Sequence, residues 1–331
     1  MIKPKNTVLI DRMVRSPRLT CTRNSCRTYA STLRRIAKLH NVVFNADLKW
    51  LMDPNILKTI LKLENLNTLR NLVNSAAIGL QLLGTTDSLK LRERYMTQLK
   101  VLNERVDAWN KSGKLTAKQK TQTVSWSTIE KLRRITNREV QLGKMYQAAE
   151  VTWSILSKIQ ENLILFMYTT TPPTRLEWSD LRFFSSKEIN RSDPPKGNIL
   201  VMGPGKEGYK IYWSDTKTSK TMGIQLLVVP KVLARLLKKH VRFMKKFWPE
   251  NRQLLLNSSF KPMTRNGLSK FMTRMFQKRL RKKLSVSALR RIFLTDRFSK
   301  SELEEAREIH RKMGHKHETA LNWYIKKKED V

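Results

Sequence analysis

The C-terminal part of this 331-residue chain holds a tyrosine, a histidine and an arginine whose side chains are chemically able to act on a phosphate. Tyr324 carries a hydroxyl, His315 stands nine residues before it, and Arg290 lies 25 residues before the histidine. A tyrosine attacks phosphorus only after losing its proton, because at a pKa near 10 about a thousandth of free tyrosine is ionised at pH 7. A guanidinium fork holds two phosphate oxygens and stays charged. These residue types fit metal-free cleavage of a phosphodiester.

Helix signals predict the elements that position these side chains. Residues 301–304 (Ser-Glu-Leu-Glu) form a capping box, which predicts a helix that Gly314 ends. A second helix is expected from about Glu318, with Tyr324 on its apolar side. Upstream, residues 287–295 have the apolar spacing of a helix. The candidate groups therefore belong to the ends and faces of three consecutive helices.

This arrangement resembles the C-terminal signature of the tyrosine recombinases, or phage-type integrases. In that family an arginine on a helix is followed some 20–25 residues later by Leu/Met-Gly-His and then by a tyrosine about nine residues further on. The matching elements are Ser287-x-x-Arg290, Met-Gly-His at 313–315, and Tyr324. The resemblance implies that Tyr324 forms a 3′-phosphotyrosyl link and that His315 assists it.

Two further family elements have candidates upstream. Residues 172–181 (Pro-Pro-Thr-Arg-Leu-Glu-Trp-Ser-Asp-Leu) resemble the segment that carries the family's first arginine, here Arg175. A Thr-Lys-Thr in an expected β-hairpin turn resembles the family's lysine turn, with Lys217 as the favoured residue and Lys220 as the alternative. The resemblance implies that Arg175 and Arg290 hold the non-bridging phosphate oxygens and that the lysine protonates the leaving 5′ oxygen.

Two positions depart from the family pattern. Ser287 stands where the family usually has histidine, and a hydroxyl donates to a phosphate oxygen but does not carry a proton as imidazole does. The acid that the family has three residues beyond the first arginine falls on Trp178, so that Glu177 is the nearest substitute. These departures leave the proton relay at both positions open.

The charge of the chain predicts a polyanionic partner. It has 66 Lys and Arg against 27 Asp and Glu, a formal net charge of +39 and a pI of about 10.6. The excess is spread over the chain and does not follow one amphipathic helix, which favours nucleic acid over a lipid surface. Candidate DNA-binding residues are Arg27, Arg34, Arg35 and Lys38 on an expected helix, and Lys278, Arg279, Arg281, Lys282 and Lys283 in a dense cluster.

That cluster belongs to a longer basic stretch, since thirteen Lys and Arg stand against one acid between Lys261 and Lys300. A solvated helix face and a nuclear-import patch are the alternatives to a DNA-contacting surface. The DNA-contacting surface is favoured because the whole domain shares the positive excess.

Composition excludes several other classes of protein. Apolar residues make up 40% of the chain, enough for packed cores, and Cys21 and Cys26 cannot build a disulfide framework. The longest apolar runs are too short for a membrane span, and no signal peptide is evident. We expect no metal, cofactor or membrane, and an intracellular, DNA-associated protein: in the host nucleus or a viral replication compartment if eukaryotic, in the cytoplasm if prokaryotic.

The pattern of the chain predicts a mainly α protein with a small antiparallel β-sheet. Residues 1–16 are expected to form a basic N-terminal arm, 17–110 a helical unit, 111–122 a charged linker and 123–331 a second domain. The resemblance makes these units a core-binding and a catalytic domain. Expected strands are Asn198–Met202, Tyr209–Trp213 and Gly223–Val229, and one expected helix is Leu142–Tyr168.

These features together predict a site-specific DNA recombinase, the integrase of a virus or mobile element. Two domains would clamp duplex DNA, and the resemblance implies a homotetramer on two DNA sites. A type IB topoisomerase and a hairpin-forming telomere resolvase use the same kind of tyrosine and are the nearest alternatives. A DNA-binding protein with a decayed catalytic site is the alternative from another class, and Ser287 is the hint for it.

Overall fold

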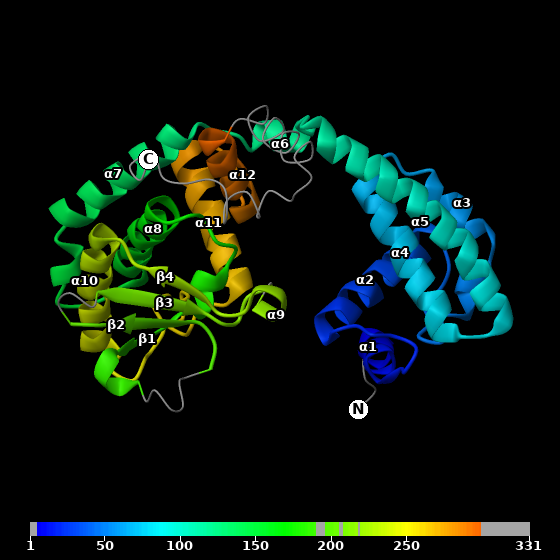
Figure 1. Ribbon diagram of the computed structural model, residues 1–331, viewed down its shortest axis with the longest axis horizontal. Helices are drawn as coiled ribbons and strands as arrows, with labels where there is room; N and C mark the ends of the chain where they lie inside the picture. The colour runs from blue at the N-terminus through cyan, green and yellow to red at the C-terminus, as the bar shows by residue number, and fades with distance from the viewer. Residues whose placement is uncertain (1–4, 190–195, 205–207, 218, 299–331) are drawn as a thin grey trace, which may run out of the picture. The chain divides into compact units, whose positions relative to one another are not determined.

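The computed structural model describes residues 5–189, 196–204, 208–217 and 219–298, and helices dominate it (Figure 1). The chain divides into two compact units, Met1–Leu115 and Thr116–Val331, which are described separately below. The boundary lies inside the segment 111–122. That segment is partly helical, because it contains the end of one helix, at Ser112, and a short helix at Ala117–Thr121.

The first unit is a set of helices packed around one core. Its central helix α4 contacts α2 and α5 along their lengths. Asn65, Thr22 and Thr85 cap these three helices, each accepting a backbone N–H three residues on. The helices are α1 (Lys5–Arg15), α2 (Arg23–Leu39), η1 (Lys49–Met52), α3 (Asn55–Leu61), α4 (Leu66–Leu83) and α5 (Thr86–Ser112).

Gly79 lets α4 approach its neighbours closely. A Cβ built on this glycine would lie 2.5 Å from Cδ1 of Leu51 and 3.3 Å from Cδ2 of Leu33. Both leucines are fully buried, on η1 and α2 respectively. Any side chain at Gly79 would therefore push α4 away from these elements.

The expected N-terminal arm at residues 1–16 is wrong, because residues 5–15 form helix α1. Leu9 and Met13, one helical turn apart, are fully buried in the core of the first unit. Arg12 donates to the carbonyl of Ala46 at 2.9 Å and ties the helix to a loop. The apolar stripe contains too few positions among the surrounding polar residues to stand out as helical periodicity.

The second unit is built on α8, whose middle is buried on nearly all sides. The expected helix Leu142–Tyr168 is wrong at its start, because α7 ends at Leu142 and α8 begins only at Trp153, where Thr152 caps it. The helices are α6 (Ala117–Thr121), α7 (Trp126–Leu142), η2 (Met145–Gln147), α8 (Trp153–Thr170), η3 (Glu177–Asp180), η4 (Ser186–Glu188), α9 (Ser219–Met222), α10 (Lys231–Phe247), α11 (Arg265–Leu280) and α12 (Val286–Arg297).

A four-stranded sheet lies beside α8 and α10 in this unit, and its strand order is β1-β2-β3-β4 (Figure 1). The expected purely antiparallel sheet is wrong, because β1 pairs in parallel with β2 while the other two pairs are antiparallel. The three expected strands are confirmed as β2 to β4, and β1 is added. The strands are β1 (Arg182–Ser185), β2 (Ile199–Met202), β3 (Tyr209–Trp213) and β4 (Gln225–Val228).

Strand β1 escaped prediction because it is short and its pairing is not local. Only Phe183 among its four residues is fully buried, and its N–H donates to the carbonyl of Arg252 at 2.8 Å. Within the described ranges, no helix is both long and apolar enough to cross a bilayer.

His240 on α10 is a fully buried histidine with two polar contacts. Its Nε2 donates to the carbonyl of Leu254 at 2.7 Å, and the Tyr146 hydroxyl lies 3.4 Å from its Nδ1. Burial lowers the pKa of His240 from 6.5 to about 4. The ring is therefore neutral in the folded protein under ordinary conditions.

This burial predicts a loss of stability in acid. Between pH 6.5 and 4 the unfolded chain binds a proton at His240 that the folded chain does not, so the free energy of unfolding falls as the pH falls, by up to about 3 kcal/mol. Urea denaturation of the protein and of His240→Gln at several pH values measures this. The stability advantage of the histidine over glutamine should shrink in acid, and parallel pH profiles would contradict the prediction.

Candidate functional site

The segment after α8 holds Arg175 with its side chain exposed. Its backbone is held from the core side, because the hydroxyl of Tyr168 donates to the Arg175 carbonyl at 2.5 Å. Tyr168 is only 1% exposed and lies in the last turns of α8. The breaks at Pro172 and Pro173 end the helix and turn the chain back over this tyrosine. The core of the unit thus determines where Arg175 emerges.

Arg290 lies on α12, half-buried in the second turn of the helix. The helix begins at Ser285, which caps it by accepting the N–H of Ala288 at 3.1 Å. Burial and the Glu177 carboxylate raise the pKa of Tyr168, whereas the Arg290 guanidinium lowers it. The charge of Arg290 therefore acts on the tyrosine whose hydroxyl holds the backbone of Arg175.

The loop after β3 carries Lys217, which is exposed. The side chain of Asn198 holds this loop, because it donates to the Asp215 carbonyl at 3.1 Å and accepts the Asp215 N–H at 3.0 Å. Lys220 lies in the short helix α9, which occupies the connection where the sequence predicted only a hairpin turn. The first part of the loop is fixed, while the lysine at position 217 projects to solvent.

Arg265 joins this loop to the segment that follows Arg175. Its Nε donates to Oδ2 of Asp180 at 2.5 Å, at the end of η3. Its NH2 donates to the Asp215 carbonyl at 3.0 Å and lies 3.3 Å from Oδ2 of Asp215. One guanidinium at the start of α11 therefore fastens together the two segments that carry Arg175 and Lys217. Sequence reasoning missed it, because its partners are 85 and 50 positions away and no local motif marks them.

The remaining candidates of the catalytic set are placed differently. Ser287 is exposed in the first turn of α12. Tyr324 and His315 lie outside the described residues. Trp178, where the family has an acid, is a fully buried core residue whose ring stands edge-on to Trp213 with centroids 5.1 Å apart.

Glu177 is buried, with 6% of its surface exposed. The charge of its carboxylate raises the pKa of the Tyr168 hydroxyl. The nearest substitute for the missing acid is therefore a buried carboxylate, unlike the exposed side chain of Arg175. In the described ranges, no cluster of three or more His, Cys, Asp or Glu side chains has the arrangement to hold a metal ion.

Helix α2 in the first unit presents a basic face. The opposite face packs into the core through Cys26, Ala30, Leu33 and Ala37. Helical geometry places positions 27, 34 and 38 in one stripe with position 35 at its edge. The exposed basic residues are Arg27, Arg34, Arg35 and Lys38.

The basic cluster at the end of α11 divides into two kinds of residue. Lys278, Arg281 and Lys283 are exposed and line a cavity of about 280 Å³, and Lys282 is half-buried next to them. Among the described residues, none of these four has an ion-pair partner. They are available for phosphate.

Arg279, also expected to bind DNA, is the exception, because it forms ion pairs inside the unit. It binds both oxygens of Glu139 at 2.9 and 2.8 Å and Oε2 of Glu161 at 2.9 Å, and only 20% of its side chain is exposed. These hydrogen bonds raise the pKa of the guanidinium. Arg279 therefore joins α11 to α7 and α8, because the helical spacing that exposes Lys278 turns the next residue inward.

Comparison of the chain with models of protein families, with curated proteins and with solved structures finds no match in any of the three.

The two neighbouring basic residues predict opposite phenotypes. Arg279→Met leaves Glu161 buried without its cation, and we expect the free energy of unfolding to fall by about 2–4 kcal/mol with the salt dependence of DNA binding unchanged. Lys278→Met, the matched control, should leave stability within about 0.5 kcal/mol and reduce the slope of log affinity against log salt by about one. Urea denaturation and DNA titrations at several salt concentrations measure both. A flatter slope for Arg279→Met with unchanged stability would reverse the assignment.

Proposed function

We propose that this protein is a site-specific tyrosine recombinase, which cleaves and rejoins duplex DNA through a 3′-phosphotyrosyl intermediate on Tyr324. The order and spacing of the sequence elements suggest the family. The observation that carries the proposal is that two arginines from distant segments both relate to Tyr168: its hydroxyl holds the Arg175 carbonyl, and the charge of Arg290 lowers its pKa. Arginines from two distant segments are what a phosphoryl-transfer site needs, since charge builds up on the non-bridging oxygens in the transition state.

The proposed reaction is an in-line displacement at phosphorus. The Tyr324 oxygen, having lost its proton, forms a bond to phosphorus, and the bond from phosphorus to the 5′ oxygen breaks with its electron pair on that oxygen. A lysine supplies the proton that the leaving oxygen takes up, for which Lys217 is favoured and Lys220 is the alternative. His315 assists the tyrosine. Rejoining reverses each step, so the phosphotyrosine preserves the bond energy and no external energy source is required.

Ser287 has a role that suits its position. It is exposed in the first turn of α12, one turn before Arg290 on the same helix. A hydroxyl there donates a hydrogen bond to a phosphate oxygen, and the helix N-terminus adds favourable potential for an anion. In this proposal the serine binds phosphate and does not relay protons.

DNA binding is proposed to use basic surfaces on both units. The stripe on α2 and the free cations around the cavity at the end of α11 are exposed and lack acidic partners in the described structure. Contacts of this kind bind the phosphate backbone without reading its sequence. The proposed assembly on two DNA sites is a homotetramer, since exchange of four strands requires four tyrosines.

Covalent trapping tests the proposed function. On nicked suicide substrates the broken strand diffuses away, so that cleavage leaves the protein linked to DNA. Mass spectrometry of the DNA-linked peptide should identify Tyr324. Tyr324→Phe should abolish the adduct and keep DNA affinity, because phenylalanine lacks the nucleophile. Tyr212→Phe on β3 is the matched control and should form the adduct normally.

The other outcomes of this assay separate the alternatives. An undiminished adduct in Tyr324→Phe would show that another residue is the nucleophile. Relaxation of plasmid that lacks any recognition site would indicate a topoisomerase, and tight binding without any adduct would indicate a protein with a decayed site.

Loss of either candidate arginine should affect cleavage far more than affinity. Arg175→Ala and Arg290→Ala each remove one charged donor from the transition state, and we expect the cleavage rate to fall by about a hundredfold or more. Affinity should change only modestly, because each is one phosphate contact among many. Single-turnover cleavage and equilibrium DNA titration provide the two numbers. Arg138→Ala, an exposed arginine on α7, serves as control, and equal losses of rate and affinity would make Arg175 and Arg290 ordinary backbone contacts.

A further inference from the structure

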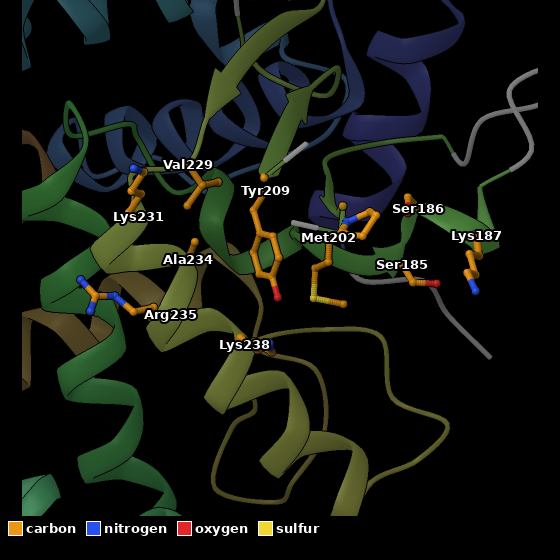
Figure 2. A pocket seen from close by; sticks show the side chains of 13 residues that line it. Ser185, Ser186, Lys187, Met202, Tyr209, Val229, Lys231, Ala234, Arg235 and Lys238 are labelled. Atoms are coloured by element: carbon orange, nitrogen blue, oxygen red, sulfur yellow. The ribbon is translucent and has the colours of Figure 1, made fainter. Parts of the chain in front are cut away.

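A cavity of about 730 Å³ lies at one end of the sheet, between the strand ends and α10 (Figure 2). Tyr209 and Met202 lie beside each other in its lining (Figure 2). Lys231, Arg235 and Lys238 line it from α10, and the charged ends of Lys231 and Arg235 extend away from the ring of Tyr209 (Figure 2). Lys187 on η4 stands on the opposite side. Its volume falls within the range of small-molecule sites in proteins.

The strand register separates this cavity from the candidate catalytic residues. Met202 pairs with Tyr209 at the cavity end of β2 and β3. Asn198 and Asp215, which hold the loop of Lys217, meet at the other end of the same two strands. The five residues of β3 span about 14 Å between these ends. The cavity is therefore a second site in this unit.

The lining of the cavity is strongly cationic. Lys231, Arg235 and Lys238 follow one face of α10 over about 10 Å, which is room for more than one phosphoryl group. No acid lines the cavity in the described part of the chain, and none of its four cations has an ion-pair partner there. The nearby Glu188 is occupied, since it binds Arg252 at 2.6 Å and the N–H of Ser185 at 2.7 Å.

The start of α10 adds to the attraction for anions. Helix α10 is 17 residues long, and Pro230 at its N-cap provides no side-chain hydrogen bond. Its first N–H groups therefore lack intrahelical partners next to Lys231, at the positive end of the helix dipole. The cations and the N-terminus of α10 therefore attract an anion to the same rim of the cavity.

The floor of the cavity is apolar and contains a flat ring. Tyr209 is half-buried, burial raises the pKa of its hydroxyl, and Arg242 lies near enough to oppose that shift. The hydroxyl is therefore neutral, and the ring offers a face on which a base can stack. Met202, Val229 and Ala234 complete an apolar surface around it. An acidic peptide would use the cations but would leave this surface without a partner.

We propose that this cavity binds a nucleotide, with its base against Tyr209 and Met202 and its phosphates on Lys231, Arg235 and Lys238. The nucleotide is either a free nucleoside polyphosphate or the terminal nucleotide of a nucleic-acid strand, since both present the same chemistry. The inference goes beyond the proposed recombinase function and stands without it, because no candidate catalytic residue lines the cavity.

Fluorescence titration of the full chain tests the proposal. The probes are a fluorescent N-methylanthraniloyl ATP and a labelled 5′-phosphorylated thymidine trinucleotide, in about 150 mM salt to screen unspecific attraction to a chain of charge +39. We expect saturable binding of at least one probe. Tighter binding of the ATP analogue would identify a free nucleotide as the ligand, and tighter binding of the trinucleotide would identify a strand end.

Two variants and one control locate the binding. The double change Lys231→Gln and Arg235→Gln should weaken binding at least about tenfold, because two charge-assisted contacts are lost. Tyr209→Leu should weaken it with the cations intact. The control, Lys131→Gln with Lys158→Gln, removes the same charge from exposed positions on α7 and α8 and should bind like the parent protein. Circular dichroism confirms that each variant is folded.

Three results would overturn the proposal. They are the absence of saturable binding by either probe, equal weakening by the control and by the α10 variant, and full competition by inorganic triphosphate or a poly-glutamate peptide at the same concentration as the nucleotide. Tyr324→Phe should bind the nucleotide normally. Failure of the recombinase proposal would therefore leave this test unaffected.

Discussion

The hydrogen bond from the Tyr168 hydroxyl to the Arg175 carbonyl is the constraint on which the arrangement of the candidate site depends. It joins a residue of the buried core to the backbone at Arg175, whose own side chain is exposed. Arg265 extends this order outward, because it ties Asp180 beyond that segment to Asp215 in the lysine loop. The proposed phosphate site would thereby rest on fixed backbone, with the exposed side chains of Arg175 and Lys217 left to adapt.

The scarce acids of the chain have a structural role that makes the basic surface possible. The described carboxylates of Glu139, Glu161 and Glu188 bind arginines inside the second unit. The pairs of Glu139 and Glu161 fix α7 and α8 against α11, and that of Glu188 fixes η4 to the loop after α10. Cations such as Lys278 and Arg281 have no acidic partner among the described residues. The surface charge of the unit is thus the consequence of how its few acids are placed. Mutual repulsion among the free cations favours a bound polyanion.

Local signals predicted much of the fold. Helices α2, α4 and α5 were predictable because an apolar stripe and a capping residue agree in each. Strand β3 was predictable because its apolar run is bounded by turn residues.

Helix α1 and strand β1 were missed, since their stability comes from contacts with distant residues such as Ala46 and Arg252. The ion pairs of Arg279 were not foreseen for the same reason, since its carboxylate partners lie 118 and 140 positions away. Arg175 and Arg290 are candidates from the family spacing and stay predictions, whereas Tyr168 and Arg265 were not foreseen because no local pattern marks them. Tyr324 and His315 stay predictions.

The bare backbone at Gly79 fixes the rotation of α4 about its own axis in the first unit. At Gly79 the leucine methyl groups touch backbone, so α4 has no side chain there that could change rotamer. Turning α4 by one residue, about 100°, would bring Ile78 or Leu80 against η1 and force the two elements apart. Since Leu33 of α2 rests on the same glycine, α2 is oriented together with α4. The direction in which the basic stripe of α2 faces is therefore determined by the one residue of α4 that lacks a side chain.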